Sequence, residues 1–224
     1  MKNLKTILLS VFGMMAISFT SCNTDSTDYS IDYQTQKQYQ STMANTYSGK
    51  MRVYYADAQK QSYVKYDSVQ TRWTVRTDST LTLSDFPVSV LDSCINLNTP
   101  YAGSNNQEVQ KLRSLKEAIG KLDTKLDLKC YYYVPTTSFV TSSAISFFVN
   151  PIYFKQTLEY DGGKHDVYFV FLTNNFGGNY NYTTRTFEFN MYLNSITFDK
   201  APVDFNNQVS KMFFRNLLFT CLSK

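Results

Sequence analysis

Hydrophobic and polar residues alternate along most of the chain, which is the pattern of β-strands that bury one face. Within residues 49–56, Met51, Val53 and Tyr55 alternate with Arg52, Tyr54 and Ala56. Further strands are expected at residues 62–67, 72–83, 126–134, 144–149, 152–160, 165–173 and 183–198. Because short turn-like segments separate several of these strands, the chain is predicted to form a β meander.

Glycine-containing segments mark two turns of this meander. Gly162 and Gly163 follow Asp161 and can adopt positive φ at no steric cost. Residues 152–160 and 165–173 are therefore predicted to form a hairpin. The segment 174–179 is predicted to form the next turn.

Helical spacing appears in two places. Apolar residues three or four positions apart predict an amphipathic helix over residues 107–122; these are Val109, Leu112, Leu115, Ile119 and Leu122. Val209, Met212, Phe213, Leu217 and Leu218 repeat the pattern near the carboxyl end. We expect this second, more apolar helix to pack in the core, with partner or membrane contact as the alternative. The resulting fold class is α+β, mainly antiparallel β, with sandwich-like or barrel-like sheets and two amphipathic helices.

Two stretches of the chain align without gaps. Residues 81–90 match residues 196–205, and each stretch ends a strand with Pro-Val. Asn-Asn-Gln follows in both cases, at 105–107 and 206–208, where Asn can cap a helix. A duplicated unit of strands and a helix, with halves at about 47–122 and 126–224, is one interpretation. Coincidence in a chain rich in Asn and strands is the other.

The amino terminus has the features of a secretory signal peptide. Lys2 and Lys5 precede an apolar run over residues 7–17, which is too short to cross a bilayer. Residues 19–22, Phe-Thr-Ser-Cys, resemble the lipobox of Bacteroidetes-type lipoproteins. The resemblance implies that residues 1–21 are removed and that Cys22 is acylated. An ordinary secretory peptide with an incidental cysteine is the alternative.

Location follows from the same resemblance. Asn23 rather than Asp follows the cysteine, which by analogy with Gram-negative lipoproteins favours the outer membrane, facing either the periplasm or the medium. Residues 22–46 are polar and are expected to form the lipidated cysteine and a flexible tether, with a single β-rich domain at 47–224. Residues 47–53 and 80–88 resemble those of uncharacterised Bacteroidetes-type lipoproteins, which implies an exported β-rich domain and transfers no active site.

Charge and cysteine content exclude several classes. The net charge is +4, and the basic residues are scattered, which argues against a nucleic-acid partner. If Cys22 carries lipid, Cys94, Cys130 and Cys221 remain, so at most one internal disulfide can form. There is no C-x-x-C spacing. We expect these three residues to act as buried small hydrophobes rather than reactive thiols.

Candidate catalytic chemistry is sparse. His165 is the only histidine, which excludes a zinc site with several histidines and places the one candidate base beside a turn. Residues 161–166 lack the alternating oxygen ligands of a calcium loop, so a tight turn is expected there. No phosphate-binding or nucleophile-elbow motif occurs, and no cofactor or metal is expected. Paired carboxylates of a cell-envelope hydrolase, similar to a glycosidase, remain the enzymatic alternative.

Aromatic content is the strongest remaining signal, with 18 Tyr, 17 Phe and a single Trp. Tyrosines on strands can present flat apolar faces to a glycan, a lipid or a protein, although aromatic residues also favour strands for structural reasons. The candidate binding residues are Tyr54, Tyr63, Tyr66, Trp73, Tyr131, Tyr133, Tyr180 and Tyr182. The sequence thus predicts a non-enzymatic, membrane-tethered lipoprotein. It binds either a lipid-like ligand in an apolar cavity between sheet and helices, or a glycan or protein on a flat tyrosine-lined face.

Overall fold

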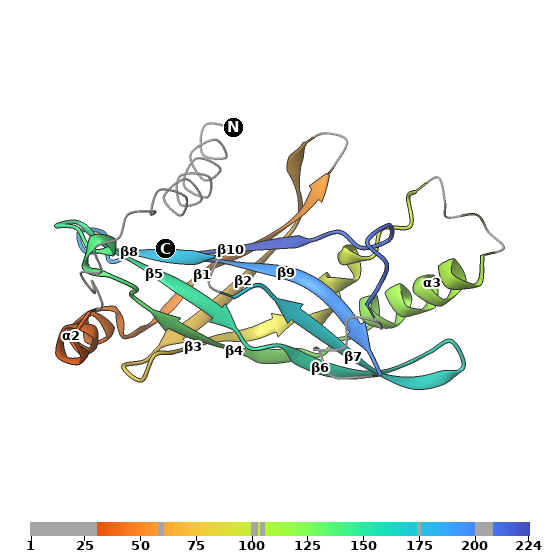
Figure 1. Ribbon diagram of the computed structural model, residues 1–224, viewed down its shortest axis with the longest axis horizontal. Helices are drawn as coiled ribbons and strands as arrows, with labels where there is room; N and C mark the ends of the chain where they lie inside the picture. The colour runs from red at the N-terminus through yellow and green to blue at the C-terminus, as the bar shows by residue number, and fades with distance from the viewer. Residues whose placement is uncertain (1–30, 58–60, 100–102, 104–105, 174–175, 200–207) are drawn as a thin grey trace, which may run out of the picture.

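Eight antiparallel strands close into a barrel in the computed structural model, which describes residues 31–57, 61–99, 103, 106–173, 176–199 and 208–224 (Figure 1). The barrel strands, in order around it, are β1 Asn45–Asp57, β2 Ser62–Val75, β3 Thr80–Pro87, β4 Lys125–Tyr133, β5 Ala144–Pro151, β8 Gly177–Asn181, β9 Phe187–Phe198 and β10 Leu217–Ser223. Pairing of β10 with both β9 and β1 closes the ring. The predicted α+β class with a barrel-like, mainly antiparallel sheet is confirmed.

One long hairpin extends beyond the barrel. Strand β6, Phe154–Tyr160, follows β5 and pairs with β7, Gly163–Phe171, while β5 pairs with β8. Its turn is Asp161 and Gly162, both at positive φ, as a two-residue type I′ turn requires. Strand β7 pairs with the second half of β9, so the predicted hairpin is confirmed and projects toward α3 (Figure 1).

Aromatic side chains fill the interior of the barrel. Seven rings are at most 1% exposed there: Trp73, Phe86, Tyr132, Phe147, Phe187, Phe189 and Phe219. They pack directly on one another, with ring centroids 4.7 Å apart for Phe147 and Phe187 and 5.4 Å apart for Trp73 and Phe189. An eight-stranded barrel is just wide enough for side chains to fill it. These rings therefore form the main hydrophobic core.

Helix α3, Gln107–Gly120, confirms the helix that the spacing of apolar residues predicts over residues 107–122. It lies at one end of the barrel (Figure 1). The side chain of Asn106 accepts a hydrogen bond from the Glu108 backbone N–H at 2.9 Å and starts the helix. Two short 3₁₀ helices, η2 Val88–Cys94 and η3 Thr137–Phe139, are also present in the described residues. None of the helices in the described ranges is long and apolar enough to cross a bilayer.

Helix α2, Tyr33–Met43, corrects the prediction of a tether that extends to residue 46. The Asp32 side chain caps this helix by accepting from the backbone N–H groups of Gln34 and Thr35. Met43 is fully buried, and Gln40 donates to the Ser79 hydroxyl at 2.5 Å. Contacts with the barrel therefore order a polar sequence whose composition favours disorder. The predicted signal peptide and Cys22 lie outside the described residues.

Strand β10 corrects the prediction of a helix near the carboxyl end. Leu217, Phe219 and Cys221 face the core, while Leu218 packs on the outside with Tyr54 and Phe176. Both faces of β10 are thus apolar, and periodicity alone cannot distinguish such a run from a buried helix. Because residues 208–224 contain no helix, the duplicated unit lacks its second helix in the described part, and residues 200–207 lie outside it.

Smaller boundary predictions are also wrong. The predicted strand over 72–83 is interrupted by a turn at residues 76–79, so its first part belongs to a longer β2 and its second part to β3. The predicted turn over 174–179 lies partly outside the described residues, and Gly177 already begins β8. Ser79 has a φ of 68° in the β2–β3 turn. Positive φ is uncommon for serine, so the residue type gave no indication of a turn at this position.

Candidate functional site

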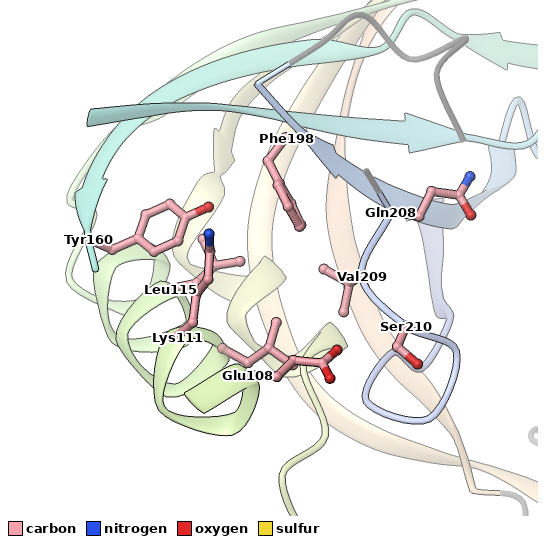
Figure 2. A pocket seen from close by; sticks show the side chains of 9 residues that line it. Glu108, Lys111, Leu115, Tyr160, Phe198, Gln208, Val209 and Ser210 are labelled. Atoms are coloured by element: carbon pink, nitrogen blue, oxygen red, sulfur yellow. The ribbon is translucent and has the colours of Figure 1, made fainter. Parts of the chain in front are cut away.

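A small pocket lies between α3 and the projecting ends of the sheet, with a volume of about 50 Å³ (Figure 2). Its walls come from one helix, two strand ends and the segment before β10. The lining residues are Glu108, Lys111, Leu112, Leu115, Tyr160, Phe198, Gln208, Val209 and Ser210. One of the two binding modes predicted from the sequence places the ligand in an apolar cavity between sheet and helices. This pocket has such a position, although it is small.

The α3 wall follows from helical spacing. Glu108, Lys111, Leu112 and Leu115 are separated by three, one and three positions, which places them on one face of the helix. Leu112 and Leu115 are buried and make the apolar part of this wall. Val209, also buried, lies on the other side of the pocket (Figure 2). The inner part of the pocket is therefore apolar.

Tyr160 brings a polar group into this apolar surface. It is the last residue of β6 and is 3% exposed, and its hydroxyl has no hydrogen-bond partner among the residues that the structure describes. Figure 2 shows the hydroxyl oxygen directed into the pocket on the side of Lys111. Burial, and then the charges of Asp199 and Asp161, raise the pKa of Tyr160 well above its ordinary value. The group therefore remains an O–H donor, and leaving it unpaired costs about 1–3 kcal/mol.

Lys111 supplies a cation at the rim of the pocket. Its Nζ lies 5.6 Å from the centroid of the Phe198 ring and 3.6 Å from Asp161 Oδ2. Both members of the ion pair are substantially exposed, so solvent weakens their attraction. The ammonium can therefore exchange Asp161 for another acceptor at small cost.

The single histidine holds the strand ends beside the pocket. His165 Nδ1 and Asp199 Oδ2 are 2.8 Å apart, and the His165 ring lies 4.5 Å from that of Tyr160, centroid to centroid. Asp199 has a φ of 62°, and its backbone N–H donates to Asp166 O at 2.8 Å. These contacts fix the end of β9 next to the hairpin, and so position Phe198 relative to Tyr160.

The aspartates around the pocket already have partners. Asp166 accepts from Lys155 Nζ at 2.8 Å and from the Thr157 hydroxyl at 2.7 Å. These two hydrogen bonds lower the pKa of Asp166. Asp199 is bound to His165. Within the described ranges, no three His, Cys, Asp or Glu side chains converge to a group that could hold a metal ion.

The aromatic residues predicted to bind a ligand are dispersed over the barrel. Tyr54 is buried, and Tyr63 half-buried, in a small cluster on the outside of the barrel. Trp73 and Tyr180 are buried in the main core, and the half-buried Tyr182 packs against Tyr180 with centroids 5.7 Å apart. None of these five residues lines the pocket.

The other three candidates retain exposed surface in separate places. Tyr131 is 55% exposed, whereas Tyr133 packs against Phe148 with ring centroids 5.6 Å apart. Tyr66 is 45% exposed and donates to Asp92 Oδ1 at 3.0 Å. The structure therefore brings no more than neighbouring pairs of the predicted residues together.

Sequence reasoning missed Tyr160, Lys111 and Phe198 as a group. The helical face containing Leu112 and Leu115 was visible, and Lys111 lies beside it. Tyr160 directly precedes the turn at Asp161, but no sequence signal indicated that this turn faces α3. The pocket arises from a long-range contact, which the spacing of residues along one element cannot reveal.

Residues 42–198 match the model of a family described as a domain of unknown function, DUF4840. The chain belongs to this family. The expectation of an uncharacterised domain family is thereby confirmed. The matched region of this DUF4840 protein includes α3, Tyr160 and Phe198, but not the pocket residues at 208–210.

No curated protein matches the DUF4840 chain. Among solved structures, the ywiB protein from Bacillus subtilis is similar to it with a TM-score of 0.27 and 6% sequence identity, over 83% of this chain and 99% of that one.

Proposed function

We propose that this protein is a Bacteroidetes-type lipoprotein of the outer membrane that binds a ligand or partner of the cell envelope without catalysis. In this proposal Cys22 carries the lipid, and the pocket beside α3 faces away from the membrane. The ligand is then a glycan or another molecule outside the bilayer rather than the lipid tails themselves.

The observation that carries this proposal is the position of the pocket relative to the amino-terminal end of the described chain. Helix α2 lies at one end of the barrel and α3 at the other (Figure 1). Cys22 precedes Ile31 by nine positions, which even an extended chain spans in at most roughly 30 Å. An anchor at Cys22 would therefore keep the α2 end near the membrane and leave the α3 end exposed.

The chemistry around the pocket supports binding more than hydrolysis. Asp161, Asp166 and Asp199 each have a basic or hydrogen-bonding partner. A glycosidase needs one carboxyl group that stays protonated beside a second that is ionised. The lowered pKa of Asp166 is opposite to that of a general acid. An apolar pocket with one unpaired hydroxyl is better suited to holding a small group.

Fatty-acid labelling tests the anchor. The full-length chain, expressed with an alkyne analogue of palmitate, is expected to carry label and to sediment with membranes. Cys22→Ala should abolish the label and release the protein, because an acylated cysteine supplies about 0.8 kcal/mol per buried CH₂. Cys94→Ala is the matched control and should retain the label. Label on the Cys22→Ala protein would contradict the proposal.

Quenching by lipid headgroups tests the orientation. Ser41 in α2 and Lys164 in β7 are both exposed, whereas the three internal cysteines are buried. A dye on Ser41→Cys in the reconstituted lipoprotein should be quenched more strongly by headgroup quenchers than a dye on Lys164→Cys. Equal quenching, or the reverse order, would exclude the proposed orientation.

A further inference from the structure

We propose that the pocket beside α3 receives the acetamido group of an N-acetylated amino sugar, with the acetyl methyl group against Leu112 and Leu115 and the carbonyl oxygen accepting from Tyr160. This inference rests on the proposed function, because it names the ligand class of the same pocket. It is carried by the size of the pocket, its apolar inner surface and the orientation of one buried hydroxyl.

The size of the pocket excludes a whole sugar ring. A volume of about 50 Å³ has room for roughly three to five water-sized groups, since each needs about 10–15 Å³ on this measure. An acetyl terminus has a comparable size, whereas a pyranose ring does not fit. The ring of the sugar would therefore remain at the rim, where Glu108, Gln208 and Ser210 offer polar side chains.

The distribution of polarity matches an acetyl group. Leu112, Leu115 and Val209 are at most 6% exposed and offer an apolar surface for a methyl group. The unpaired hydroxyl of Tyr160 is a donor that a carbonyl oxygen can satisfy. A purely apolar ligand would leave this buried hydroxyl unpaired and would therefore bind less tightly than one with a carbonyl acceptor.

The charges around the pocket favour a neutral ligand over a carboxylate. Lys111 is the cation among the lining residues, and Glu108 is the anion. Asp161 lies 3.6 Å from the Lys111 ammonium and compensates its charge further. An anionic group such as acetate would meet more negative than positive charge here, whereas an acetamide offers a carbonyl acceptor without a charge.

The decisive variant is Tyr160→Phe. Because the Tyr160 hydroxyl has no partner within the described protein, its removal breaks no hydrogen bond and should leave the fold intact or slightly more stable. The same change should weaken binding by about fivefold, which corresponds to about 1 kcal/mol for one lost hydrogen bond. A merely structural role of Tyr160 would not produce this combination.

The experiment is calorimetric titration of the full-length lipoprotein in detergent micelles with the trisaccharide of N-acetylglucosamine. Binding is expected for the wild type and for Tyr168→Phe, a half-buried tyrosine of β7 outside the pocket, and should be weakened in Tyr160→Phe. The corresponding glucosamine trisaccharide, which lacks the acetyl groups, should bind at least tenfold more weakly than the acetylated form.

Several outcomes would overturn the inference. They are equal binding of the deacetylated trisaccharide, no effect of Tyr160→Phe, no binding of the acetylated trisaccharide, and equal or tighter binding of N-acetylalanine. The last outcome would assign the pocket to an acylated peptide. Fatty-acid labelling at Cys22 and the quenching experiment are independent of these titrations. If they succeed while the sugar fails to bind, only the ligand class is wrong and the proposed anchoring and orientation stand.

Discussion

Gly49 in β1 lies against the backbone carbonyl oxygen of Leu222 in β10, at the seam where the barrel closes. A Cβ atom at position 49 would overlap this oxygen. Because the obstructing atom belongs to the backbone, it cannot move away by a change of rotamer. Gly49→Ala is therefore expected to destabilise the protein by about 1–3 kcal/mol.

Urea unfolding monitored by Trp73 fluorescence measures this effect. Gly103→Ala is the matched control, since a Cβ at position 103 meets nothing within 4 Å among the described residues. The control should change the free energy of unfolding by less than about 0.5 kcal/mol. A Gly49→Ala protein as stable as the control would show that β1 and β10 are not in close contact.

Asp32 is expected to determine whether α2 remains folded on the barrel. Its carboxylate accepts from the backbone N–H groups of Gln34 at 2.9 Å and Thr35 at 3.0 Å. Asp32→Ala should lower the stability of α2, because these two N–H groups lose their acceptor. Hydrogen exchange should then become faster in α2 but not in α3. Asn106→Ala is the reciprocal variant and should affect α3 alone.

The three internal cysteines should be unreactive in the folded protein. Cys94, Cys130 and Cys221 are buried and free, and burial raises the pKa of each thiol. Because the thiolate is the reactive form, an aromatic disulfide reagent should titrate none of them without denaturant and all three in guanidinium. Fewer than three thiols in denaturant would mean that an internal disulfide had formed.

The salt bridge on the hairpin predicts a change in acid stability. Hydrogen bonds from Lys155 and Thr157 lower the pKa of Asp166 below its ordinary value of 3.8. Its contribution to stability is therefore present above pH 3.8 and is lost as the pH falls through the lowered pKa. Thr157→Val should raise the pKa of Asp166 in a carbon-detected NMR titration. Thr184→Val, on another exposed loop, should leave it unchanged.

Local signals predicted the parts of the fold that depend on local chemistry. Alternation at Met51 and Val53 identified β1, and the two glycines after Asp161 identified the hairpin turn. The positive φ angles, however, lie at Asp161 and Gly162, and Gly163 already begins β7. Helix α3 followed from apolar residues spaced by three and four positions. Both β1 and α3 bury one face, so the spacing of apolar residues within each element was enough to predict it.

The errors have physical causes that depend on tertiary contacts. Leu218 is apolar on the outer face of β10 because it packs with Tyr54 and Phe176, so the strand shows no alternation. Helix α2 is polar and becomes ordered through buried contacts of Met43 with the barrel. Tyr160 meets α3 only after the long hairpin has formed. The candidate site was therefore not predictable from the spacing of residues along any one element.

The β6–β7 hairpin contributes Tyr160 to the pocket but is not part of the closed ring of eight strands. The barrel is closed by the pairing of β10 with both β9 and β1, whereas β6 pairs with β7 alone. Two residues added to each arm of this hairpin keep the alternation of inner and outer faces and leave the closed ring unchanged. A change in the length of this hairpin would therefore alter the depth and lining of the pocket without altering the barrel.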